Sequence, residues 1–320
     1  MGWSPLVTFA LISYNAEQFV GAAVEGALAQ SYAPLEIILS DDCSNDTTFS
    51  IMEELAGKYT GENRVRLNRN EVNLGLGEHI NKIMELAQGE YIIIAAGDDI
   101  STPERAAEII KKFEAGGKRI MAVFSDWIEI DGKGEDQKIV SAEPPAGFTE
   151  LPLMCRHMFR GIPGATNAWH RSVFDVFGPM QKNIVFEDRV IAFRAALLGE
   201  ISHSALPLVR YRRHETNTVE MFHVTSFAAM RKRLACFRDV YINNIIDLNT
   251  FFASGNLNPK VFAKCMSIMK RELRKLNGYL RLLDGGIIAI FSGLVQVVIN
   301  GGNPIPLVWQ CICSLKKGRN

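Results

Sequence analysis

The first hundred residues alternate between two hydrophobic patterns, and this alternation limits the chain to one class of fold. Short apolar runs at 6–12, 35–39 and 91–95, with a weaker one at 65–67, are typical of buried strands. Between them, apolar residues recur every three or four positions, as on one face of a helix. This succession of strand and helix predicts a βαβ series, and therefore an α/β fold on a parallel sheet.

Two of these predicted strands end in a pair of aspartates. Asp41-Asp42 follows the run at 35–39, and Asp98-Asp99 follows the run at 91–95. Because ligands of parallel α/β sheets bind at the carboxyl ends of the strands, these pairs mark that edge as a candidate site. Either pair alone is equally well explained as a turn or a helix cap, where aspartate is common. Their equivalent positions in one sheet favour a shared site.

The size and composition of the chain fit one large α/β domain with a smaller second region. Its 320 residues are 48% hydrophobic and 22% charged, as in a folded globular protein. The six cysteines are scattered without a C-x-x-C pair, so we expect a reducing compartment in preference to disulfides or structural zinc. No charged segment precedes an apolar stretch at the start, so no signal peptide is expected.

The two parts of the chain differ in charge. Residues 1–230 hold 21 Lys/Arg and 31 Asp/Glu, a formal charge of −10, whereas residues 231–320 hold 14 against 4, which is +10. Basic and apolar residues are interleaved in this second part, as in helices on an anionic bilayer, or equally in solvated helices that pack on the rest of the protein. We therefore expect a first domain over 1–220 and a basic helical region over 221–320.

The end of the chain contains two uncharged apolar runs. The run at 287–299 has thirteen residues, fewer than the about 20 that a membrane-spanning helix needs. A Gly/Pro break at 301–304 separates it from a second run that reaches Leu315. This pattern predicts an interfacial or re-entrant hairpin, with the basic residues of 316–319 at the lipid headgroups. Core or dimer packing is the alternative, and no nucleic-acid partner is expected.

Several short motifs, taken in order, resemble those of the family 2 glycosyltransferases, which have the GT-A fold. Any single motif is weak, but the ordered set is specific and extends over about residues 5–218, two thirds of the chain. The matching segments are Ser13-Tyr14-Asn15, Gln30-Ser31-Tyr32, Ser40-Asp41-Asp42-Cys43-Ser44-Asn45-Asp46, Asn73-Leu74-Gly75, Asn81, Gly89-Glu90-Tyr91-Ile92, Gly97-Asp98-Asp99, Glu187-Asp188 and Tyr211-Arg212-Arg213-His214.

The sequence departs from the family pattern at two positions. Many members have D-x-D before the final aspartate, but here the leading position is Ala96. The helix after Asn-Leu-Gly often reads A-R-N, whereas here Ile80 precedes Asn81, so one basic residue that could face phosphate is absent. These departures bear on the choice of metal and on the diphosphate contacts.

The resemblance implies an inverting glycosyltransferase, which moves a sugar from a nucleotide-sugar donor, a UDP- or dTDP-sugar, to an acceptor hydroxyl. A divalent cation, Mn²⁺ or Mg²⁺, would stabilise the diphosphate leaving group as a Lewis acid. Asp99 is the implied direct ligand of that cation, and Asp98 would hold the ribose or the sugar of the donor. The alternative for this pair is a turn or helix cap before Ser101-Thr102-Pro103.

The resemblance also implies the catalytic acids and the phosphate contacts. Asp188 would act as general base on the acceptor hydroxyl, and Glu187 would orient the acceptor. Alternatively, these two acids only stabilise their helix through its dipole. His214 would complete the metal shell and Arg212 would contact the phosphates, unless both are surface residues without a role. The other five histidines show no metal-ligand spacing, so we expect them to be structural.

The remaining implied contacts are with the nucleotide. Asp41 would accept the N3–H of a uracil or thymine ring, while a capping role explains Asp42 and Asp46 at least as well. The backbone of residues 10–12 would flank the base. The expected nucleotide-sugar-binding residues are Ala10, Leu11, Ile12, Tyr14, Asp41, Asn73, Asn81, Asp98 and Arg212.

The expected partners depend on the C-terminal region. If it lies on lipid, the acceptor is expected to be a polyprenyl-diphosphate-linked saccharide at the cytoplasmic face of the plasma membrane, in bacterial O-antigen or capsule assembly. A homo-oligomer is left open. A nucleotidyltransferase fits less well, because the loop at 13–17 has no basic residue for a triphosphate. A catalytically silent sugar-binding or assembly protein would not need both Asp98-Asp99 and Glu187-Asp188.

Overall fold

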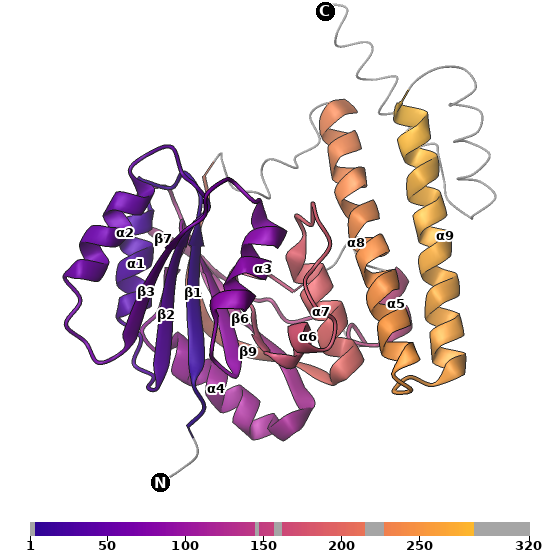
Figure 1. Cartoon of the computed structure of the whole chain (residues 1–320), viewed down its shortest axis with the longest axis horizontal. Coiled ribbons are helices and arrows are strands. Elements are labelled where there is room, and N and C mark those ends of the chain that lie inside the picture. Colours follow the sequence, from indigo (N-terminus) through magenta and orange to yellow (C-terminus); the bar gives the residue numbers. More distant parts are fainter. Residues whose placement is uncertain (1–3, 145–146, 157–161, 215–226, 285–320) are drawn as a thin grey trace, which may run out of the picture. The chain divides into compact units, whose positions relative to one another are not determined.

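The chain forms two compact units in a computed structural model, which describes residues 4–144, 147–156, 162–214 and 227–284 (Figure 1). The first unit comprises Met1–Glu150 and Arg160–Arg213, and the second comprises Leu151–Phe159 and His214–Asn320. The predicted boundary between residues 220 and 221 lies outside the described residues and stays a prediction. No pattern in the sequence indicated that 151–159 groups with the C-terminal region.

A mixed sheet forms the centre of the first unit. Its strands are β1 (Val7–Ser13), β2 (Leu35–Asp41), β3 (Arg64–Arg69), β4 (Tyr91–Ala96), β5 (Ile100–Ser101), β6 (Ile120–Ile130), β7 (Asp136–Val140), β8 (Ala168–His170) and β9 (Glu200–Arg212). Their order is β3-β2-β1-β4-β8-β6-β9-β5, with β7 paired to β6. The first four strands of this order run parallel, so their carboxyl ends lie at one edge.

Helices pack on this sheet on both sides (Figure 1). They are α1 (Val20–Leu28), α2 (Thr48–Gly57), α3 (Leu76–Leu86), α4 (Arg105–Gly116), α6 (Ser172–Asp175), α7 (Glu187–Leu198) and two 3₁₀ helices, Gly117–Arg119 and Gly164–Thr166. Alternate strand residues such as Phe9, Ile37 and Ile93 form one core with α1, α2 and α4. Because successive strand residues point to opposite faces, their neighbours face the other side, where α3 lies.

The α/β fold is confirmed, and the four predicted strands appear with ends that differ by at most two residues. The sequence from 121 to about 211 has a looser hydrophobic pattern than the first hundred residues, and most of the two longest strands, β6 and β9, lies there, paired in parallel. Residues 130–150 are rich in Gly, Glu, Lys and Pro, a composition that predicts a surface loop, but they contain β7. This strand pairs only with β6 among the described residues and is mostly exposed, so it shows no hydrophobic alternation to predict it from.

The second unit contains a helical hairpin and one short helix. Its elements are α5 (Leu151–Arg156), α8 (Phe227–Ala253) and α9 (Pro259–Leu283). The turn of the hairpin uses Gly255 at a φ of 78°, a backbone conformation that favours glycine. The side chain of Asn258 accepts the backbone N–H of Lys260 (2.9 Å), and Pro259 occupies the first turn. These residues give α9 a well-defined start.

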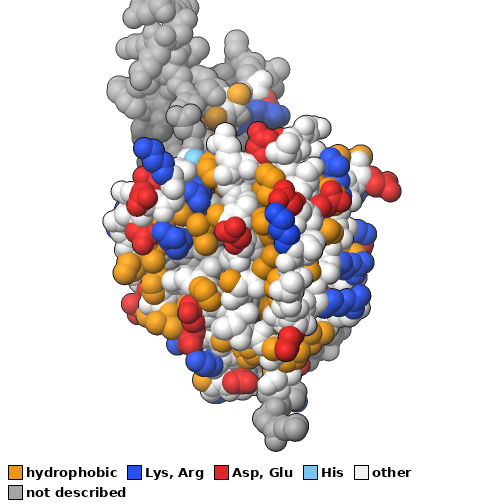
Figure 2. Space-filling model, turned by 90° about the vertical axis from the view of Figure 1, so that its left-hand side faces the viewer, with side chains coloured by type: hydrophobic (Ala, Val, Ile, Leu, Met, Phe, Trp, Pro, Cys, Tyr) orange, Lys and Arg blue, Asp and Glu red, His pale blue; other side chains and the backbone are white. Residues whose placement is uncertain are grey.

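Charge is distributed differently in the two units. On the face of the first unit that Figure 2 shows, acidic and basic side chains are interspersed. In the second unit, α8 and α9 together carry eleven Lys/Arg and three Asp/Glu. Basic residues such as Lys260, Lys264 and Lys270 are exposed, whereas Tyr241 and Met269 are buried. The predicted basic amphipathic helices are therefore present.

The apolar hairpin predicted at 287–315 lies outside the described residues. In the part of the chain that is described, every helix is either too short or too polar to cross a bilayer.

Candidate active site

The carboxyl ends of β1, β2 and β4 bring the two aspartate pairs to one edge of the sheet. Ser13 of β1 is paired with Asp41 of β2. The backbone N–H of Asp42 donates to the carbonyl of Ser13 (2.9 Å), and that of Gly97 donates to the carbonyl of Ile12 (2.9 Å). The end of β1 therefore lies between the two pairs, which confirms the predicted placement.

Gly97 is needed at this edge because the chain passes very close to β1. A Cβ atom at Gly97 would overlap the hydroxyl of Ser13 and would lie 3.3 Å from the carbonyl oxygen of Ile12. Only glycine avoids that overlap without moving the backbone. The close approach fixes the turn that follows, Asp98-Asp99, against the end of β1.

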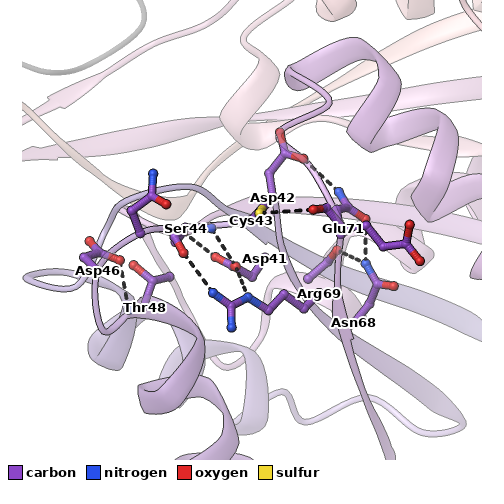
Figure 3. A network of polar contacts seen from close by, with 12 residues as sticks. Asp41, Asp42, Cys43, Ser44, Asp46, Thr48, Asn68, Arg69 and Glu71 are labelled. Carbon is purple, nitrogen blue, oxygen red and sulfur yellow. Dashed lines mark hydrogen bonds and ion pairs between the residues drawn. The ribbon is translucent and has the colours of Figure 1, made fainter.

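Asp41 is fully buried, and its carboxylate is held within its own loop (Figure 3). Its Oδ2 accepts the backbone N–H of Ser44 (2.9 Å) and lies 3.5 Å from Nε of Arg69. Its Oδ1 accepts the Ser44 hydroxyl. Cys43 closes the turn at a φ of 62°. Asp41 thus holds the loop after β2, and its contact with a nucleotide base stays a prediction.

Asp42 holds a second loop at the same edge (Figure 3). Its carboxylate accepts three hydrogen bonds, from the side chain of Asn70 (2.8 Å) and from the backbone N–H groups of Leu74 and Gly75 (2.9 Å each). Gly75 has a φ of 78°. These bonds make Asp42 the residue that holds the loop before α3, and they place Asn73, which is exposed, beside the edge. The donor contact expected of Asn73 stays a prediction.

Asp46 orders the start of α2. Its side chain accepts the backbone N–H of Thr48 (3.0 Å) and that of Glu17 (3.2 Å). Partial burial raises the pKa of Asp46, but the hydrogen bonds from Thr48 and Glu17 outweigh burial and place that pKa below its ordinary value. The structure therefore supports the capping interpretation of this residue.

His79 belongs to the hydrogen-bond network under these loops. Its Nε2 lies 2.6 Å from the hydroxyl of Ser40, which also accepts a hydrogen bond from the side chain of Asn68 (2.9 Å). Burial lowers the pKa of His79, although the charges of Asp42 and Asp41 oppose this effect. A neutral, hydrogen-bonded imidazole here has a structural role.

Asp99 is buried, at 4% exposure, and one of its carboxylate oxygens lacks a partner. Oδ1 accepts the backbone N–H of Arg212 (2.8 Å). Oδ2 has no hydrogen-bond partner among the residues that the structure describes. Burial, and next the charge of Asp98, raises the pKa of Asp99 well above its ordinary value. A buried carboxylate oxygen without a donor is costly unless something binds it, so Asp99 is well placed to hold a cation.

Arg212 holds the Asp98-Asp99 turn from the other side. Its Nε donates to the carbonyl of Asp98 (2.9 Å), and Nη1 donates to the carbonyls of Asp131 (3.1 Å) and Gly132 (3.2 Å). The guanidinium also lies 4.8 Å from the ring centre of Phe19. These contacts make Arg212 a positioning residue of the turn. Its predicted contact with donor phosphates stays a prediction.

Arg105 lies close to this turn, and no motif in the sequence singled it out. It is fully buried, and its Nη2 donates to the carbonyls of Ile94 (2.7 Å) and Ala165 (2.9 Å). Burial lowers the pKa of Arg105 to about 10, while the charge of Asp99 opposes that change. The only signal in the sequence is that Arg105 follows Asp99 by six positions. Such a spacing of a basic and an acidic residue is too common to indicate a site.

Glu187 and Asp188 form the first residues of α7, and we call them the α7 acid pair. A Cβ at Gly164 would lie 2.6 Å from Oε1 of Glu187 and 3.7 Å from Cβ of Asp188, so this pair rests against the Gly164–Thr166 helix. Burial and the charge of Asp188 raise the pKa of Glu187 to about 8. Burial raises the pKa of Asp188 as well, against the charge of Arg189.

A short path of contacts connects the Asp98-Asp99 turn to the α7 acid pair within the first unit. Asp99 interacts electrostatically with Arg105, and Arg105 donates to the carbonyl of Ala165. The next residue back, Gly164, lies against Glu187. Residues far apart in the sequence thus converge around one region.

The residues expected to flank the base lie inside β1. Ala10 and Leu11 are fully buried and Ile12 is 8% exposed, and the strand is paired with β2 on one side and β4 on the other. Tyr14, just beyond the strand, is 47% exposed. The aromatic ring of Tyr14 is therefore more accessible to a ligand than residues 10–12, whose donor contacts stay predictions.

Two more residues predicted to belong to the site are Asn81 and His214. The amide of Asn81 both donates to the carbonyl of Met180 (2.9 Å) and accepts its backbone N–H (2.8 Å), which joins α3 to a distant segment. Its donor contact stays a prediction. His214 is half-buried and begins the C-terminal part of the second unit, and its role as a metal ligand also stays a prediction.

Comparison with known families decides what kind of protein has this site. The sequence profile described as glycosyl transferase family 2 matches residues 8–177, more than half of the chain. The chain belongs to this family. It is therefore a glycosyltransferase, as the ordered motifs indicated.

Curated relatives of this glycosyltransferase have related descriptions. It is 25% identical over 286 residues to an uncharacterized glycosyltransferase of Haemophilus influenzae, in a match that covers 85% of each chain. It is 32% identical over 129 residues to the succinoglycan biosynthesis protein ExoO of Rhizobium meliloti. That match covers 40% of this chain and 36% of ExoO, so the chain spans about a third of this relative. Relatives of the chain thus include a protein named for succinoglycan biosynthesis.

Solved structures share the fold of this family 2 glycosyltransferase. TarS 1–349 of S. aureus in complex with UDP-GlcNAc gives a TM-score of 0.55 at 13% identity, over 92% of this chain and 88% of TarS 1–349. The mannosyltransferase PcManGT of Pyrobaculum calidifontis, in complex with GDP-Man and Mn²⁺, gives 0.54 at 16% identity, over 98% and 81%. The predicted GT-A fold is confirmed.

The residues present fit a divalent cation that is held mainly by a donor diphosphate. No group of three or more His, Cys, Asp or Glu that could hold a metal occurs among the described residues. Mg²⁺ is usually held by one or two carboxylates together with substrate phosphates, so a three-residue cluster is not required. The open Oδ2 of Asp99 could supply one such ligand, and the half-buried Asp98 is the preceding residue.

Proposed function

We propose that the chain is an inverting, metal-dependent glycosyltransferase that uses a nucleotide-sugar donor, a UDP- or dTDP-sugar, and a hydroxyl acceptor. The observation that carries this proposal is the open, buried Oδ2 of Asp99 on the same contact path as the α7 acid pair. A carboxylate oxygen that accepts no hydrogen bond can bind a cation. Acids whose pKa values are raised by their surroundings are typical of groups that transfer protons.

Asp99 would bind a Mn²⁺ or Mg²⁺ ion through Oδ2, with Asp98 near the ribose or sugar of the donor. The cation would supply Lewis-acid stabilisation of the charge that develops on the nucleotide diphosphate as it leaves. His214 and Arg212 are proposed on the metal and phosphate side. Tyr14 and Asn73 are proposed on the nucleotide, because both are exposed at the edge where β1 and β2 end.

Asp188 would act as the general base. The acceptor oxygen attacks the anomeric carbon, its proton passes to the Asp188 carboxylate, and the bond to the diphosphate oxygen breaks on the opposite side. The pKa of Glu187 at about 8 keeps this neighbour protonated at neutral pH, so it adds no negative charge beside Asp188. The two acids would divide the roles, with the protonated Glu187 donating a hydrogen bond to the acceptor and the Asp188 carboxylate accepting its proton.

The acceptor is proposed to be a polyprenyl-diphosphate-linked saccharide at the cytoplasmic face of the plasma membrane, in bacterial surface-polysaccharide assembly. Two observations support this proposal: the excess of basic residues on α8 and α9, and a relative named for succinoglycan biosynthesis. Flotation of the full chain with vesicles of phosphatidylcholine and phosphatidylglycerol should show salt-sensitive binding. A chain that stays unbound at low salt would contradict the membrane part of the proposal.

The donor proposal is tested with a panel of UDP-, dTDP- and GDP-sugars and Mn²⁺, by thermal shift and donor hydrolysis. One nucleotide class should raise the unfolding temperature and be hydrolysed, and NMR of the transfer product should show an inverted anomeric centre. Turnover without any metal requirement, or with retention, would contradict the mechanism.

The role of Asp188 is tested by Asp188→Asn, which should lower turnover by about 10²- to 10⁴-fold and preserve donor binding. Glu85→Gln is a matched control, because Glu85 is an exposed acid on α3 paired with Lys82. A catalytically silent sugar-binding protein would bind donor in every variant without turnover in the unmodified chain.

A further inference from the structure

Arg105 joins three elements around the Asp98-Asp99 turn. Its Nη1 donates to the hydroxyl of Ser101 in β5 (2.9 Å), and its Nη2 donates to the carbonyls of Ile94 in β4 (2.7 Å) and Ala165 (2.9 Å). Ile94 precedes the turn, Ser101 follows it, and Ala165 belongs to the Gly164–Thr166 helix. One planar guanidinium thus fixes both sides of the turn to a segment that is distant in sequence.

The Arg105 side chain also supplies positive charge near Asp99, yet it forms no hydrogen bond with Oδ2 of that carboxylate. Burying a guanidinium is costly without an opposite charge nearby, and Asp99 supplies that charge. The described hydrogen bonds of Arg105 go to Ser101, Ile94 and Ala165, while Oδ2 of Asp99 has no donor among the described residues. A direct ion pair would compete with a cation for that oxygen. This arrangement balances charge and leaves the oxygen open.

The third contact of Arg105 reaches toward the α7 acid pair. Ala165 follows Gly164, and Gly164 approaches Glu187 so closely that even a methyl group would lie 2.6 Å from Oε1. A shift of the Gly164–Thr166 helix would therefore move or unseat Glu187 and its neighbour Asp188. Arg105 is the side chain that donates hydrogen bonds to this helix, to β4 and to β5 at once.

We propose that Arg105 is a positioning residue of the transferase site, which sets the Asp98-Asp99 turn and the Gly164–Thr166 helix at the separation that transfer requires. The proposal rests on the proposed roles of Asp99 and Asp188. Because reacting groups must be placed within a fraction of an ångström, a shift of about 1 Å is expected to cost up to about 10²-fold in rate.

Arg105→Lys is the main test, because lysine keeps the charge but cannot make the three fixed hydrogen bonds. Arg171→Lys is the matched control. Arg171 donates in the same way to the carbonyls of Gly89 (2.9 Å) and Ala87 (3.0 Å), which precede β4 at the end away from the Asp98-Asp99 turn. Circular dichroism and thermal unfolding establish that both variants are folded.

The first readout is hydrogen–deuterium exchange of the full chain without donor or metal. In Arg105→Lys, peptides that cover 97–101 and 164–167 should both exchange faster, by about fivefold or more, because their shared anchor is lost. Arg171→Lys should leave both peptides unchanged. Unchanged exchange in a folded Arg105→Lys protein would overturn the proposal.

The second readout is transfer or donor hydrolysis with the donor found by the panel and Mn²⁺. Arg105→Lys should lower kcat by about 10- to 100-fold, with KM for the donor within about threefold, because ground-state binding is kept and alignment is lost. Faster exchange with unchanged kcat would overturn the catalytic part. If the unmodified chain turns over no donor, the proposed function fails, while the exchange result still decides whether Arg105 couples the two segments.

Ser101→Ala keeps the proposal testable if Arg105→Lys does not fold. It removes one acceptor of the Arg105 guanidinium and leaves the other two in place. Exchange at 97–101 should rise and kcat should fall by about two- to fivefold, since one of three anchors is lost. A folded Ser101→Ala protein with neither change would contradict the proposal.

Discussion

The two aspartate pairs occupy equivalent places in the sheet, yet their surroundings differ. After β2, the carboxylate of Asp42 accepts three hydrogen bonds from the loops beside it. After β4, Asp99 accepts one backbone hydrogen bond, and its second oxygen has no partner among the described residues. The same sequence signal therefore marks one pair that builds the edge of the site and one that is available for chemistry.

The loops that follow each strand explain this difference. Beyond β2, the chain returns through β3, and the loop after that strand brings the backbone N–H groups of Leu74 and Gly75 to Asp42. Beyond β4, the chain enters β5 directly, and β5 pairs with β9. That pairing brings a single backbone donor, from Arg212, to Asp99.

The largest expected effect is that of Asp99→Asn on turnover. Loss of the proposed cation ligand should reduce Mn²⁺-dependent donor hydrolysis by about 10³-fold, since a metal ion supplies several kcal/mol of transition-state stabilisation. The thermal midpoint should fall, because the neutral amide removes the negative charge that offsets burial of the Arg105 guanidinium. Hydrolysis across a range of Mn²⁺ concentrations measures the first effect and calorimetry the second. Turnover within about threefold of the unmodified chain would remove the contrast between the two pairs.

Asp42→Ala should instead destabilise the fold. It leaves the N–H groups of Leu74 and Gly75 and the amide of Asn70 without their acceptor, at an expected cost of about 2–4 kcal/mol in the free energy of unfolding. Urea titration measures this change. Asp175→Ala is the control, because Asp175 is exposed and its ion pair with the partly exposed Arg171 should contribute less than about 1 kcal/mol. Equal changes in the two variants would show that Asp42 does not hold its loop.

The pH dependence of stability should separate the chemical acids from the capping acids. The pKa of Glu187 is raised from 4.5 to about 8, so its folded form binds a proton more tightly than its unfolded form. Its contribution to stability is therefore full below about pH 4.5 and is lost as the pH rises toward 8. Glu187→Gln should flatten the fall in stability between pH 5 and pH 9, by an amount on the order of 4 kcal/mol. Parallel stability curves for the two proteins, measured by urea titration, would contradict this assignment.

Asp46 should show the opposite sign and the smallest effect. Its pKa is lowered below 3.8, so its contribution is present above that pH and is lost as the pH falls through the folded pKa. Asp46→Ala should cost about 1 kcal/mol at pH 7, as expected for a lost cap, and the difference should shrink below about pH 4. A constant difference down to pH 3 would mean that the carboxylate charge is not the cause.

Local patterns predicted the βαβ series, because hydrophobic periodicity is a property of neighbouring residues. The same patterns did not predict β6 and β9, whose burial is irregular along their length, or the grouping of 151–159 with the second unit. They also passed over Arg105, because a buried arginine looks like a surface one in sequence. Its burial depends on partners in β4, β5 and the Gly164–Thr166 helix.

The sequence by itself determined the fold family and the positions of the aspartate pairs along the chain, since strands, helices and motifs are written in consecutive residues. Only the tertiary structure decided which carboxylates are satisfied by the protein and which have an open oxygen. The donors that decide this lie far away in sequence, 32 residues for Asp42 and Leu74 and 113 residues for Asp99 and Arg212. A hydrogen bond acts over about 3 Å, so its partners are known only when the chain is folded.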